Sequence, residues 1–290
     1  MENRIDGHTR LFCLIGSPVG HSCSPAMYNY SFDKLGLNNA YLAFDVPIEV
    51  LEDAVKALKL MNVGGFNITM PDKTAVCEYL DELSPAAEMI GACNTVTVGE
   101  DGKLTGHNTD GVGFVRNLEK HGVSVKGKSI VVMGAGGAAT ALTIQAALDG
   151  ASKLAIFNRK TSKGYANAER TVAKIRSNVP GCAASANDLC DAEAFTAAVR
   201  SCDILVNATK VGMAPLDNDT LVAPSLYRPG LVVADTVYNP RETRMIKEAA
   251  AAGCTVVGGI GMLLQQGVEA FRLFTGKEMP EDEVAAKFFS

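Results

Sequence analysis

A glycine-rich nucleotide-binding fingerprint lies in the middle of this chain and not at its start. The apolar run Ile130 to Met133 is typical of a β-strand, the turn Gly134-x-Gly136-x-x-Ala139 follows it, and the stretch that ends at Leu148 is typical of a helix. Strand, tight turn and helix in this order open a Rossmann βαβ unit, where backbone N–H groups at the helix N-terminus approach a pyrophosphate. Because about one domain's length of chain precedes the fingerprint, we expect a two-domain dehydrogenase whose front half holds the substrate.

Two other interpretations of this stretch stay open at this point. Turns of small residues also occur where a helix packs tightly on a strand without binding a nucleotide. The uncharged run from Ile130 to Leu148 also has roughly the ~20-residue length that a membrane span needs. It is rich in Gly, Ala and Thr and contains Gln145, so its composition argues against an inserted helix.

The composition agrees with a pair of globular domains: 290 residues, of which 47% are hydrophobic and 20% charged, with a net charge of -5. No basic block or aromatic-interleaved patch appears, so nucleic acid is a poor partner. The N-terminal residues are polar and the apolar stretch 11–15 is too short for a signal peptide, so we expect a cytoplasmic protein. Eight scattered cysteines without a Cys-x-x-Cys pair predict reduced, mostly buried thiols and no metal site.

Apolar runs alternate with segments of helical period along nearly the whole chain, which predicts an α/β fold of parallel sheets covered by helices. The predicted strands span residues 11–15, 41–46, 64–69, 95–98, 130–133, 154–157, 204–207, 231–234 and 255–257. The predicted helices begin after Pro47 and span residues 71–83, 139–148, 241–252 and 262–274. The strand at 95–98 turns at Gly99-Glu-Asp-Gly102 and predicts a hairpin arm.

Three polar clusters precede the fingerprint: residues 22–25, residues 67–73, and Asn94-Thr95 with residues 108–111. They follow apolar strands, and strand ends are where open α/β sheets bind ligands. Oxidation of a secondary alcohol without a metal requires a positioned base or cation, which Lys73 beside Asp110 can provide. Each cluster also has a structural interpretation: Ser24-Pro25 as a helix N-cap, Lys73 as a solvated cation, and residues 108–111 as an Asx turn.

At these clusters the chain resembles the shikimate dehydrogenase family, and most closely its quinate/shikimate dehydrogenase branch. The matching motifs run in family order over nearly the whole chain. They are Gly16-Ser-Pro-Val-Gly-His-Ser-Cys-Ser-Pro25, Asn67-Ile-Thr-Met-Pro-Asp-Lys73, Gly91-Ala-Cys-Asn-Thr95, Asn108-Thr-Asp-Gly-Val-Gly-Phe114, Gly134-Ala-Gly-Gly-Ala138, Asn158-Arg159, Asn207-Ala-Thr-Lys-Val-Gly-Met213, Asp235-Thr-Val-Tyr-Asn-Pro240 and Gly261-Met-Leu-Leu-Gln-Gln266. Met70-Pro71 and the run Lys210 to Met213 favour the quinate/shikimate branch.

The resemblance implies the interconversion of shikimate and 3-dehydroshikimate, and of quinate and 3-dehydroquinate, by hydride transfer. Lys73 would exchange the proton at the reacting hydroxyl, and Asp110 would orient both Lys73 and the ring. The implied substrate-binding residues are Ser22 and Ser24 for the carboxylate with Tyr238 nearby, and Asn67, Thr69, Asn94 and Gln266 for the ring hydroxyls. The small Ser22 and Ser24 side chains would admit either acid.

The resemblance also implies the cofactor-binding residues: Gly134, Ala135, Gly136, Gly137, Ala138, Asn158, Arg159, Lys160, Thr209, Val237 and Gly261. A Rossmann strand that ends in cations favours the 2′-phosphate of NADP, whereas a carboxylate there favours NAD. Here Arg159, Lys160 and Lys163 follow the second strand, and Thr161 stands where the branch often carries Asp. We therefore expect NADP in preference to NAD, with dual use open because these cations could simply be solvated.

The implied architecture is a substrate-binding catalytic domain of residues 1–112, completed by residues 261–290, and a Rossmann NAD(P)-binding domain of residues 113–260. The C-terminal helix would return to the first domain, which would bring Gln266 to the substrate. The expected partner is a small-molecule acid, without nucleic acid, membrane or metal, for a monomer or homodimer. One alternative is a hydride-transfer enzyme for another hydroxy acid on this scaffold, and the ordered set of Lys73, Asp110 and Gln266 argues against it. The other is a non-catalytic NAD(P)-binding sensor, and the presence of Lys73 and Asp110 argues against that as well.

Overall fold

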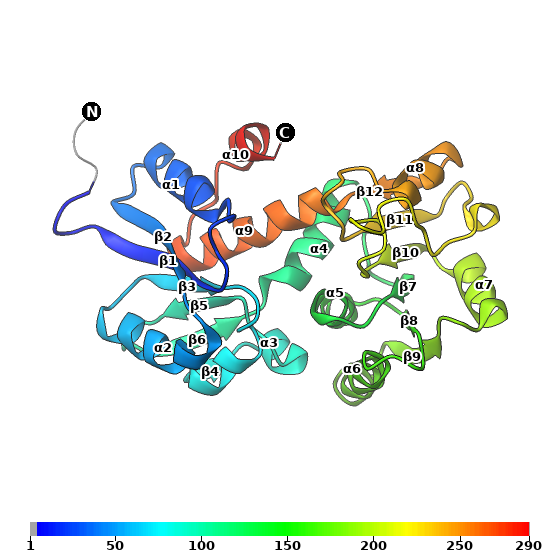
Figure 1. Cartoon of the computed structure of the whole chain (residues 1–290), viewed down its shortest axis with the longest axis horizontal. Coiled ribbons are helices and arrows are strands. Elements are labelled where there is room, and N and C mark those ends of the chain that lie inside the picture. Colours follow the sequence, from blue (N-terminus) through cyan, green and yellow to red (C-terminus); the bar gives the residue numbers. More distant parts are fainter. Residues whose placement is uncertain (1–4, 290) are drawn as a thin grey trace. The chain divides into compact units, whose positions relative to one another are not determined.

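The computed structural model describes residues 5–289, which divide into two compact units. One unit ends at Thr109 and takes in the chain again from Gln266, and the other runs from Asp110 to Gln265. Both divisions fall inside helices, α4 (Thr109–Lys120) and α9 (Gly259–Thr275) (Figure 1). The boundaries expected from the sequence, at 112/113 and 260/261, lie in the same two helices.

The first unit is built on a mixed six-stranded sheet with the strand order β2-β1-β3-β5-β6-β4. Its strands are β1 (Arg10–Gly16), β2 (Asn39–Asp45), β3 (Gly65–Ile68), β4 (Glu82–Leu83), β5 (Thr95–Val98) and β6 (Leu104–His107). The expected parallel pairing is found for β2, β1 and β3 and for β4 with β6, whereas β5 runs antiparallel to both β3 and β6. The expected hairpin explains this: a turn as short as residues 99–103 joins β5 to β6, and such a turn can only connect antiparallel strands.

Alternate residues of β1 face two different cores. Cys13 and Ile15 lie in an apolar cluster with the buried face of α2 (Leu51–Leu60) and with the 3₁₀ helix Ala75–Tyr79. Phe12 instead contacts aromatic rings of α1 (Ser24–Lys34) and α9. The remaining helical segments of this unit are the 3₁₀ helix Ile48–Val50, α3 (Pro85–Ile90) and α10 (Glu281–Phe288).

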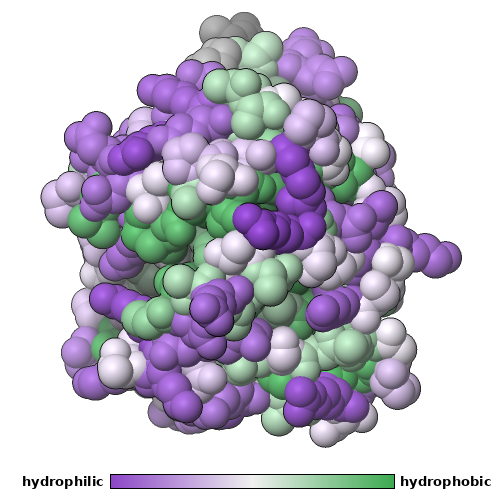
Figure 2. All heavy atoms as spheres, turned by 90° about the vertical axis from the view of Figure 1, so that its right-hand side faces the viewer, coloured by the Kyte–Doolittle hydropathy of each residue, from purple (hydrophilic) through white to green (hydrophobic). Residues whose placement is uncertain are grey.

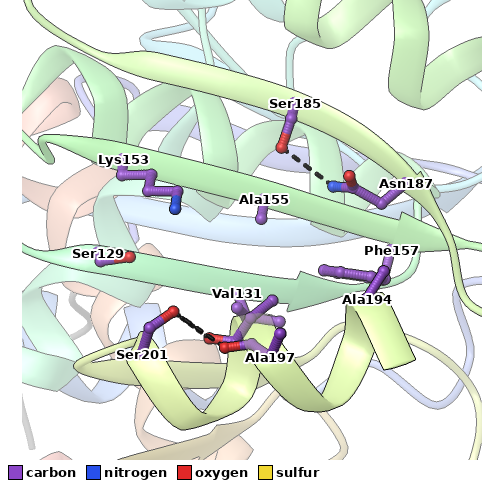
Figure 3. A pocket seen from close by; sticks show the side chains of 11 residues that line it. Ser129, Val131, Lys153, Ala155, Phe157, Ser185, Asn187, Ala194, Ala197 and Ser201 are labelled. Atoms are coloured by element: carbon purple, nitrogen blue, oxygen red, sulfur yellow. Dashed lines mark hydrogen bonds between the residues drawn. The ribbon is translucent and has the colours of Figure 1, made fainter. Parts of the chain in front are cut away.

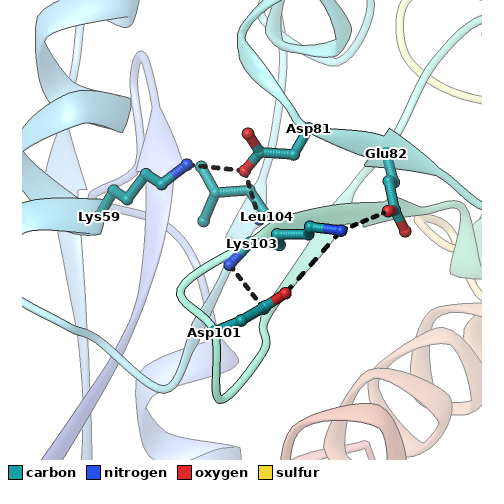
Figure 4. A network of polar contacts seen from close by, with 6 residues as sticks. All are labelled: Lys59, Asp81, Glu82, Asp101, Lys103 and Leu104. Carbon is teal, nitrogen blue, oxygen red and sulfur yellow. Dashed lines mark hydrogen bonds and ion pairs between the residues drawn. The ribbon is translucent and has the colours of Figure 1, made fainter.

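The helix expected over residues 71–83 is wrong. A 3₁₀ helix covers only Ala75–Tyr79, and the chain then becomes extended and enters β4. Asp81 explains the break: its backbone N–H donates to the carbonyl of Leu104, and its carboxylate accepts from the Leu104 N–H at 2.8 Å and from Lys59 at 2.7 Å (Figure 4). Pairing with β6 therefore outweighs the local helical pattern.

The second unit carries a six-stranded sheet that is parallel throughout, in the order β12-β11-β10-β7-β8-β9. Its strands are β7 (Ser129–Met133), β8 (Lys153–Asn158), β9 (Ala183–Asp188), β10 (Ile204–Asn207), β11 (Val232–Asp235) and β12 (Thr255–Val257). Its further helices are α5 (Gly137–Leu148), α6 (Tyr165–Asn178), α7 (Ala192–Ser201), α8 (Arg244–Ala251) and the 3₁₀ helix Pro224–Leu226. The α/β class and the remaining predicted strands and helices are confirmed.

One core of this unit joins alternate strand residues such as Val131, Phe157 and Leu205 to α7 and α8. α5 is buried along most of its length, including polar Thr143, whose hydroxyl donates to the carbonyl of Ala139 at 2.6 Å. The apolar run from residue 130 to 148 is therefore a strand, a turn and a packed helix. Within residues 5–289, no helix is both long and apolar enough to cross a membrane.

The eight cysteines are free thiols, of which Cys13, Cys93, Cys182 and Cys202 are buried. The expectation of mostly buried thiols is wrong for Cys23 and Cys190, which are exposed.

On the face drawn in Figure 2, hydrophilic residues are interspersed with small hydrophobic areas.

Candidate functional site

A chain of amides and hydroxyls, all buried except the partly buried Gln266, joins three of the predicted substrate-binding residues in the first unit. Asn67 Nδ2 donates to Thr95 Oγ1 at 2.9 Å and to the carbonyl of Asn94 at 3.1 Å. Asn94 Nδ2 lies 3.0 Å from Thr109 Oγ1, which lies 3.5 Å from Gln266 Oε1. The structure thus brings Asn67, Asn94 and Gln266 into one network, although nearly 200 residues separate the first from the last.

Strand ends position these side chains. Asn67 lies in β3, Asn94 directly precedes the neighbouring strand β5, and Thr109 opens α4 directly after β6 and Asn108. The Thr109 N–H donates to Asn94 Oδ1 at 2.8 Å, which orients the Asn94 amide. Asp110 is the next residue in the chain, so the hydrogen-bonded backbone of Thr109 fixes the position of its N–H group.

Tyr41 adds a buried hydroxyl to the network, and the predicted carboxylate-binding Ser24 influences it. Its hydroxyl donates to Asn67 Oδ1 at 2.7 Å. Burial, followed by the nearby Tyr28 and Cys13, raises the pKa of Tyr41 well above its usual range, and a hydrogen bond with Ser24 opposes that rise. Ser22 Oγ accepts from the Ser24 N–H at 3.2 Å. The N-cap of α1 is Cys23 without a side-chain cap bond, so the N-cap interpretation of Ser24 is wrong.

Lys73 lies in the turn between β3 and the 3₁₀ helix Ala75–Tyr79, and it is partly buried. Its carbonyl accepts from the Cys93 N–H at 2.8 Å. Thr69, four residues earlier, donates its N–H to the carbonyl of Ile15 at 2.9 Å. Asp72, also in this turn, is fully buried, and burial, followed by nearby Glu49, raises its pKa. Lys73 lies in the first unit, and Asp110 and Tyr238 lie in the second.

The fingerprint turn of the second unit leaves its backbone exposed at the start of α5. Gly134 adopts φ +111°, and a Cβ there would lie 2.5 Å from the carbonyl of Ala208, so this glycine is required by the fold itself. Gly136 and Gly137 are exposed, and a Cβ at either would meet nothing within 4 Å, so the protein's own packing does not require glycine there. They leave the N-terminus of α5 open to an anion.

A polar support that the sequence did not reveal holds this turn. Asn167 in α6 donates from Nδ2 to the carbonyl of Ala135 at 2.7 Å and to Thr140 Oγ1 at 2.9 Å. The sequence also did not reveal the residues that hydrogen-bond to the predicted substrate-binding side chains in the first unit, namely Tyr41, Thr95 and Thr109. Thr95 and Thr109 stand inside recognisable motifs, whereas Asn167 and Tyr41 carry no local signal.

The ends of β10 and β11 are tied together beside the fingerprint strand. Asn207 Nδ2 donates to Asp235 Oδ1 at 2.9 Å, and Thr209 Oγ1 donates to Asn207 Oδ1 at 2.7 Å. The Val237 N–H also donates to Asp235 Oδ1, at 2.9 Å. Because strand order reverses between β7 and β10, the predicted residue Thr209, after β10, lies at the topological switch point, where such sheets bind ligands. The predicted residue Val237 follows β11, the neighbour of β10 on its other side.

The predicted 2′-phosphate residues follow β8, the other neighbour of β7. Arg159 and Lys160 are exposed, and Asn158 Nδ2 donates to Ser162 Oγ at 3.0 Å. The sequence placed no carboxylate here, but Asp188, at the end of β9, accepts from the Lys160 N–H at 3.1 Å. Its carboxylate fixes the loop backbone, and hydrogen bonds from the N–H groups of Cys190 and Lys160 lower its pKa.

Two further predicted residues, Gly261 and Tyr238, differ in how far they are packed against the rest of the protein. Gly261 packs against Asn117, and a Cβ there would overlap the Asn117 side chain, so glycine is required for helix packing within the second unit. Tyr238 is half exposed beyond the end of β11. Residues 5–289 contain no cluster of His, Cys, Asp or Glu side chains suited to a metal ion.

A cavity of about 230 Å³ lies elsewhere in the second unit, between α7 and strands β7 to β9 (Figure 3). Its lining includes Ser129, Lys153, Asn187 and Ser201, and none of the predicted site residues. We therefore do not place the cofactor there.

Two protein-family models match this chain. Residues 14–96 match the shikimate dehydrogenase substrate binding domain, and residues 259–287 match the shikimate 5′-dehydrogenase C-terminal domain. A shikimate dehydrogenase (NADP(+)) of Streptococcus uberis is 49% identical over 100% of this chain and 99% of its own length. The chain belongs to the shikimate dehydrogenase family. The predicted family is confirmed.

Solved structures agree with this assignment. Shikimate 5-dehydrogenase of Listeria monocytogenes, in complex with shikimate and NAD, has a TM-score of 0.95 and 48% identity, covering 99% of this chain and 98% of that one. Quinate dehydrogenase of Corynebacterium glutamicum, in complex with NAD, has a TM-score of 0.87 and 32% identity, covering 97% and 98%. The cofactors of these relatives, NADP and NAD, are the two that the sequence suggested.

Proposed function

We propose that this chain interconverts shikimate and 3-dehydroshikimate with NADP as its preferred dinucleotide. The observation that carries the proposal is the network that joins buried Asn67 and Asn94 to partly buried Gln266. Amides and hydroxyls held in this way bind ring hydroxyls, and a substrate that lacks one hydroxyl leaves a buried polar group unpaired, which gives strong discrimination. We also assign the Thr69 hydroxyl to a hydrogen bond with a ring hydroxyl of the substrate.

The substrate carboxylate is assigned to Ser22 and Ser24, with Tyr238 nearby. Ser24 is supported by its influence on Tyr41, whose pKa its side chain lowers, because the Tyr41 hydroxyl is part of the ring-binding network. Hydroxyl groups suffice for a carboxylate whose charge stays partly solvated, so no arginine is needed.

The proton is assigned to Lys73. A bound dinucleotide supplies the acceptor for the hydride that leaves the ring carbon. As the alcohol is oxidised, Lys73 Nζ takes the proton from the reacting hydroxyl, and in the reverse reaction Lys73 returns it to the ketone oxygen. Asp110 orients Lys73 and the ring, which is supported by its position directly after Thr109.

The second unit is assigned the dinucleotide, and the first unit the substrate. The exposed turn at Gly136, Gly137 and Ala138, with Gly134 and Ala135 before it, takes the pyrophosphate. Arg159 and Lys160, preceded by Asn158, take the 2′-phosphate, which favours NADP over NAD. Thr209, Val237 and Gly261 are assigned further contacts with the dinucleotide.

We also propose quinate as a second substrate, because small serines at the carboxylate leave room for its extra hydroxyl. The test is a set of initial rates in which shikimate and quinate are each paired with NADP and NAD, with nicotinamide absorbance as the readout. We expect the highest kcat/KM for shikimate with NADP. Binding of NADP without turnover in any of the four pairs would identify a sensor and overturn the proposal.

A further inference from the structure

A pair of free thiols lies beside Lys73 without a role in the proposed reaction. Cys77 Sγ, in the 3₁₀ helix Ala75–Tyr79, lies 3.7 Å from Cys93 Sγ, just before β5. Cys93 is fully buried and Cys77 is partly exposed. One thiol of the pair is therefore reachable from solvent, and the other is reachable only from its partner.

Both cysteines form hydrogen bonds to the backbone carbonyl of Lys73. The Cys93 N–H donates to the Lys73 carbonyl at 2.8 Å, and Cys77 Sγ, in its protonated form, donates to the same oxygen at 3.7 Å. Cys93 is also followed directly by Asn94 of the substrate-side network. A covalent change at this pair would therefore reach the backbone of Lys73 and of Asn94 together.

The pair is chemically asymmetric. A hydrogen bond between the two sulfurs lowers the pKa of Cys77 to about 7, which favours its thiolate form. The same hydrogen bond, with burial, raises the pKa of Cys93 well above its usual range. The thiolate is the nucleophilic form of cysteine, so the exposed member is also the reactive one.

We propose that Cys77 and Cys93 form a peroxide-sensitive dithiol whose oxidation to a disulfide displaces Lys73 and switches the enzyme off. The Cys77 thiolate attacks one oxygen of a hydroperoxide, the O–O bond breaks, and the sulfur becomes a sulfenic acid. The alkoxide or hydroxide that leaves takes up a proton from solvent, which replaces the proton that Cys77 released on ionisation. The Cys93 sulfur then attacks the Cys77 sulfur, the S–O bond breaks, and the Cys93 proton leaves with the hydroxyl as water. Two thiols are oxidised by two electrons, and the peroxide is reduced.

Closing this bond requires movement. The sulfurs must approach from 3.7 Å to about 2.05 Å. β6 packs directly against Cys93, because a Cβ on Gly106 would lie 3.2 Å from its sulfur, so Cys93 has little room. The partly exposed 3₁₀ helix that carries Cys77 moves instead, and it begins only two residues after Lys73. A displacement of about 1 Å at a catalytic group can lower turnover by about 100-fold.

Hydrogen peroxide in small excess over the full-length protein tests the proposal. Trypsin releases residues 74–103 as one peptide that contains Cys77, Cys93 and no other cysteine. We expect this peptide to become lighter by two hydrogens and resistant to alkylation, kcat with shikimate and NADP to fall at least about tenfold, and dithiothreitol to reverse both effects.

Two variants separate this site from the other thiols. Cys77→Ser removes the reactive thiol, and we expect it to keep its activity in peroxide. Cys190→Ser removes an exposed thiol in the second unit, and we expect it to be inactivated like the wild type. Both variants keep Cys23, between Ser22 and Ser24, so any effect of its oxidation is common to all samples. If Cys77→Ser folds poorly, Cys77→Ala serves the same purpose.

Three results would overturn the proposal: a fully alkylated 74–103 peptide after inactivation, the disulfide with unchanged kcat, or equal inactivation of wild type and Cys77→Ser. The proposed loss of activity rests on the proposed function, whereas the formation of the disulfide, which the peptide mass measures, does not. If the chain failed to oxidise shikimate, the mass would still decide whether the disulfide forms, so the two failures are distinguishable.

Discussion

The Tyr41 hydroxyl donates a 2.7 Å hydrogen bond to Asn67 Oδ1, and both residues are buried. This bond leaves the Asn67 Nδ2 group directed toward Thr95 and the carbonyl of Asn94. The orientation of a proposed substrate-binding amide is thus set by a residue that no sequence motif singles out.

Replacement of Tyr41 by Phe should therefore destabilise the protein and loosen the site. Loss of a buried donor to Asn67 is expected to lower the free energy of unfolding by about 1–2 kcal/mol, measured in urea, and to raise KM for shikimate. Tyr30→Phe is the matched control, because the Tyr30 hydroxyl bonds to Glu283 at the surface. That variant should change stability by less than about 0.5 kcal/mol. Equal stability and KM in Tyr41→Phe and the wild type would contradict the network.

Two glycines of the fingerprint should respond differently to alanine. Gly136→Ala should unfold like the wild type, because its Cβ meets nothing within 4 Å, yet KM for NADP should rise at least about tenfold because backbone must approach the pyrophosphate. Gly134→Ala should unfold at lower denaturant concentration, because its Cβ would meet the Ala208 carbonyl.

Gly181→Ala is the control for these variants, since a Cβ there also meets nothing within 4 Å. It should leave both stability and KM unchanged. An unchanged KM for NADP in Gly136→Ala would move the pyrophosphate away from this turn.

Replacement of Arg159 by Ala should weaken NADP and spare NAD. Loss of a cation at the 2′-phosphate is expected to lower kcat/KM for NADP by about tenfold, which corresponds to about 1.4 kcal/mol, with little change for NAD. Lys153→Ala, at the opposite end of the same strand β8, is the control. Equal losses with both dinucleotides would assign Arg159 a structural role.

The buried carboxyl of Asp235 should give a pH-dependent difference in stability. Burial raises the pKa of Asp235 despite hydrogen bonds from Thr243, Val237 and Asn207. Its contribution is therefore most favourable below the ordinary pKa of about 3.9 and is lost as pH rises through the raised pKa. Relative to wild type, Asp235→Asn should gain stability between acidic and neutral pH in urea unfolding at a series of pH values. A difference that stays constant with pH would show that ionisation of Asp235 is not opposed by burial.

The elements of the second unit can be predicted better than those of the first, because their signals lie close together in the sequence. β7, the glycine turn and α5 follow one another directly, so strand period, turn chemistry and helix period all appear in one window. The segment 71–83 instead obeys distant contacts of Asp81 with Lys59 and Leu104, which no local pattern records. β9 was also missed, because Ala-Ala-Ser-Ala-Asn-Asp contains no β-branched or aromatic residue.

The candidate site divides in the same way. Motif residues such as Asn67, Asn94 and Gln266 could be named from the chain alone, because each stands in a recognisable run. The bonds that orient them could not, because Tyr41 and Thr109 act across strands and only the fold brings them near. The proximity of Cys77 to Cys93 is equally invisible in a sequence where 15 residues separate the two thiols.

The most direct test of the account is kcat for shikimate oxidation with NADP, measured for the wild type and for Lys73→Ala by nicotinamide absorbance. Loss of the group that takes the proton should lower kcat by at least about 100-fold while the dissociation constant of shikimate changes little. A Lys73→Ala enzyme that keeps most of its turnover would contradict the assignment of the proton to Lys73.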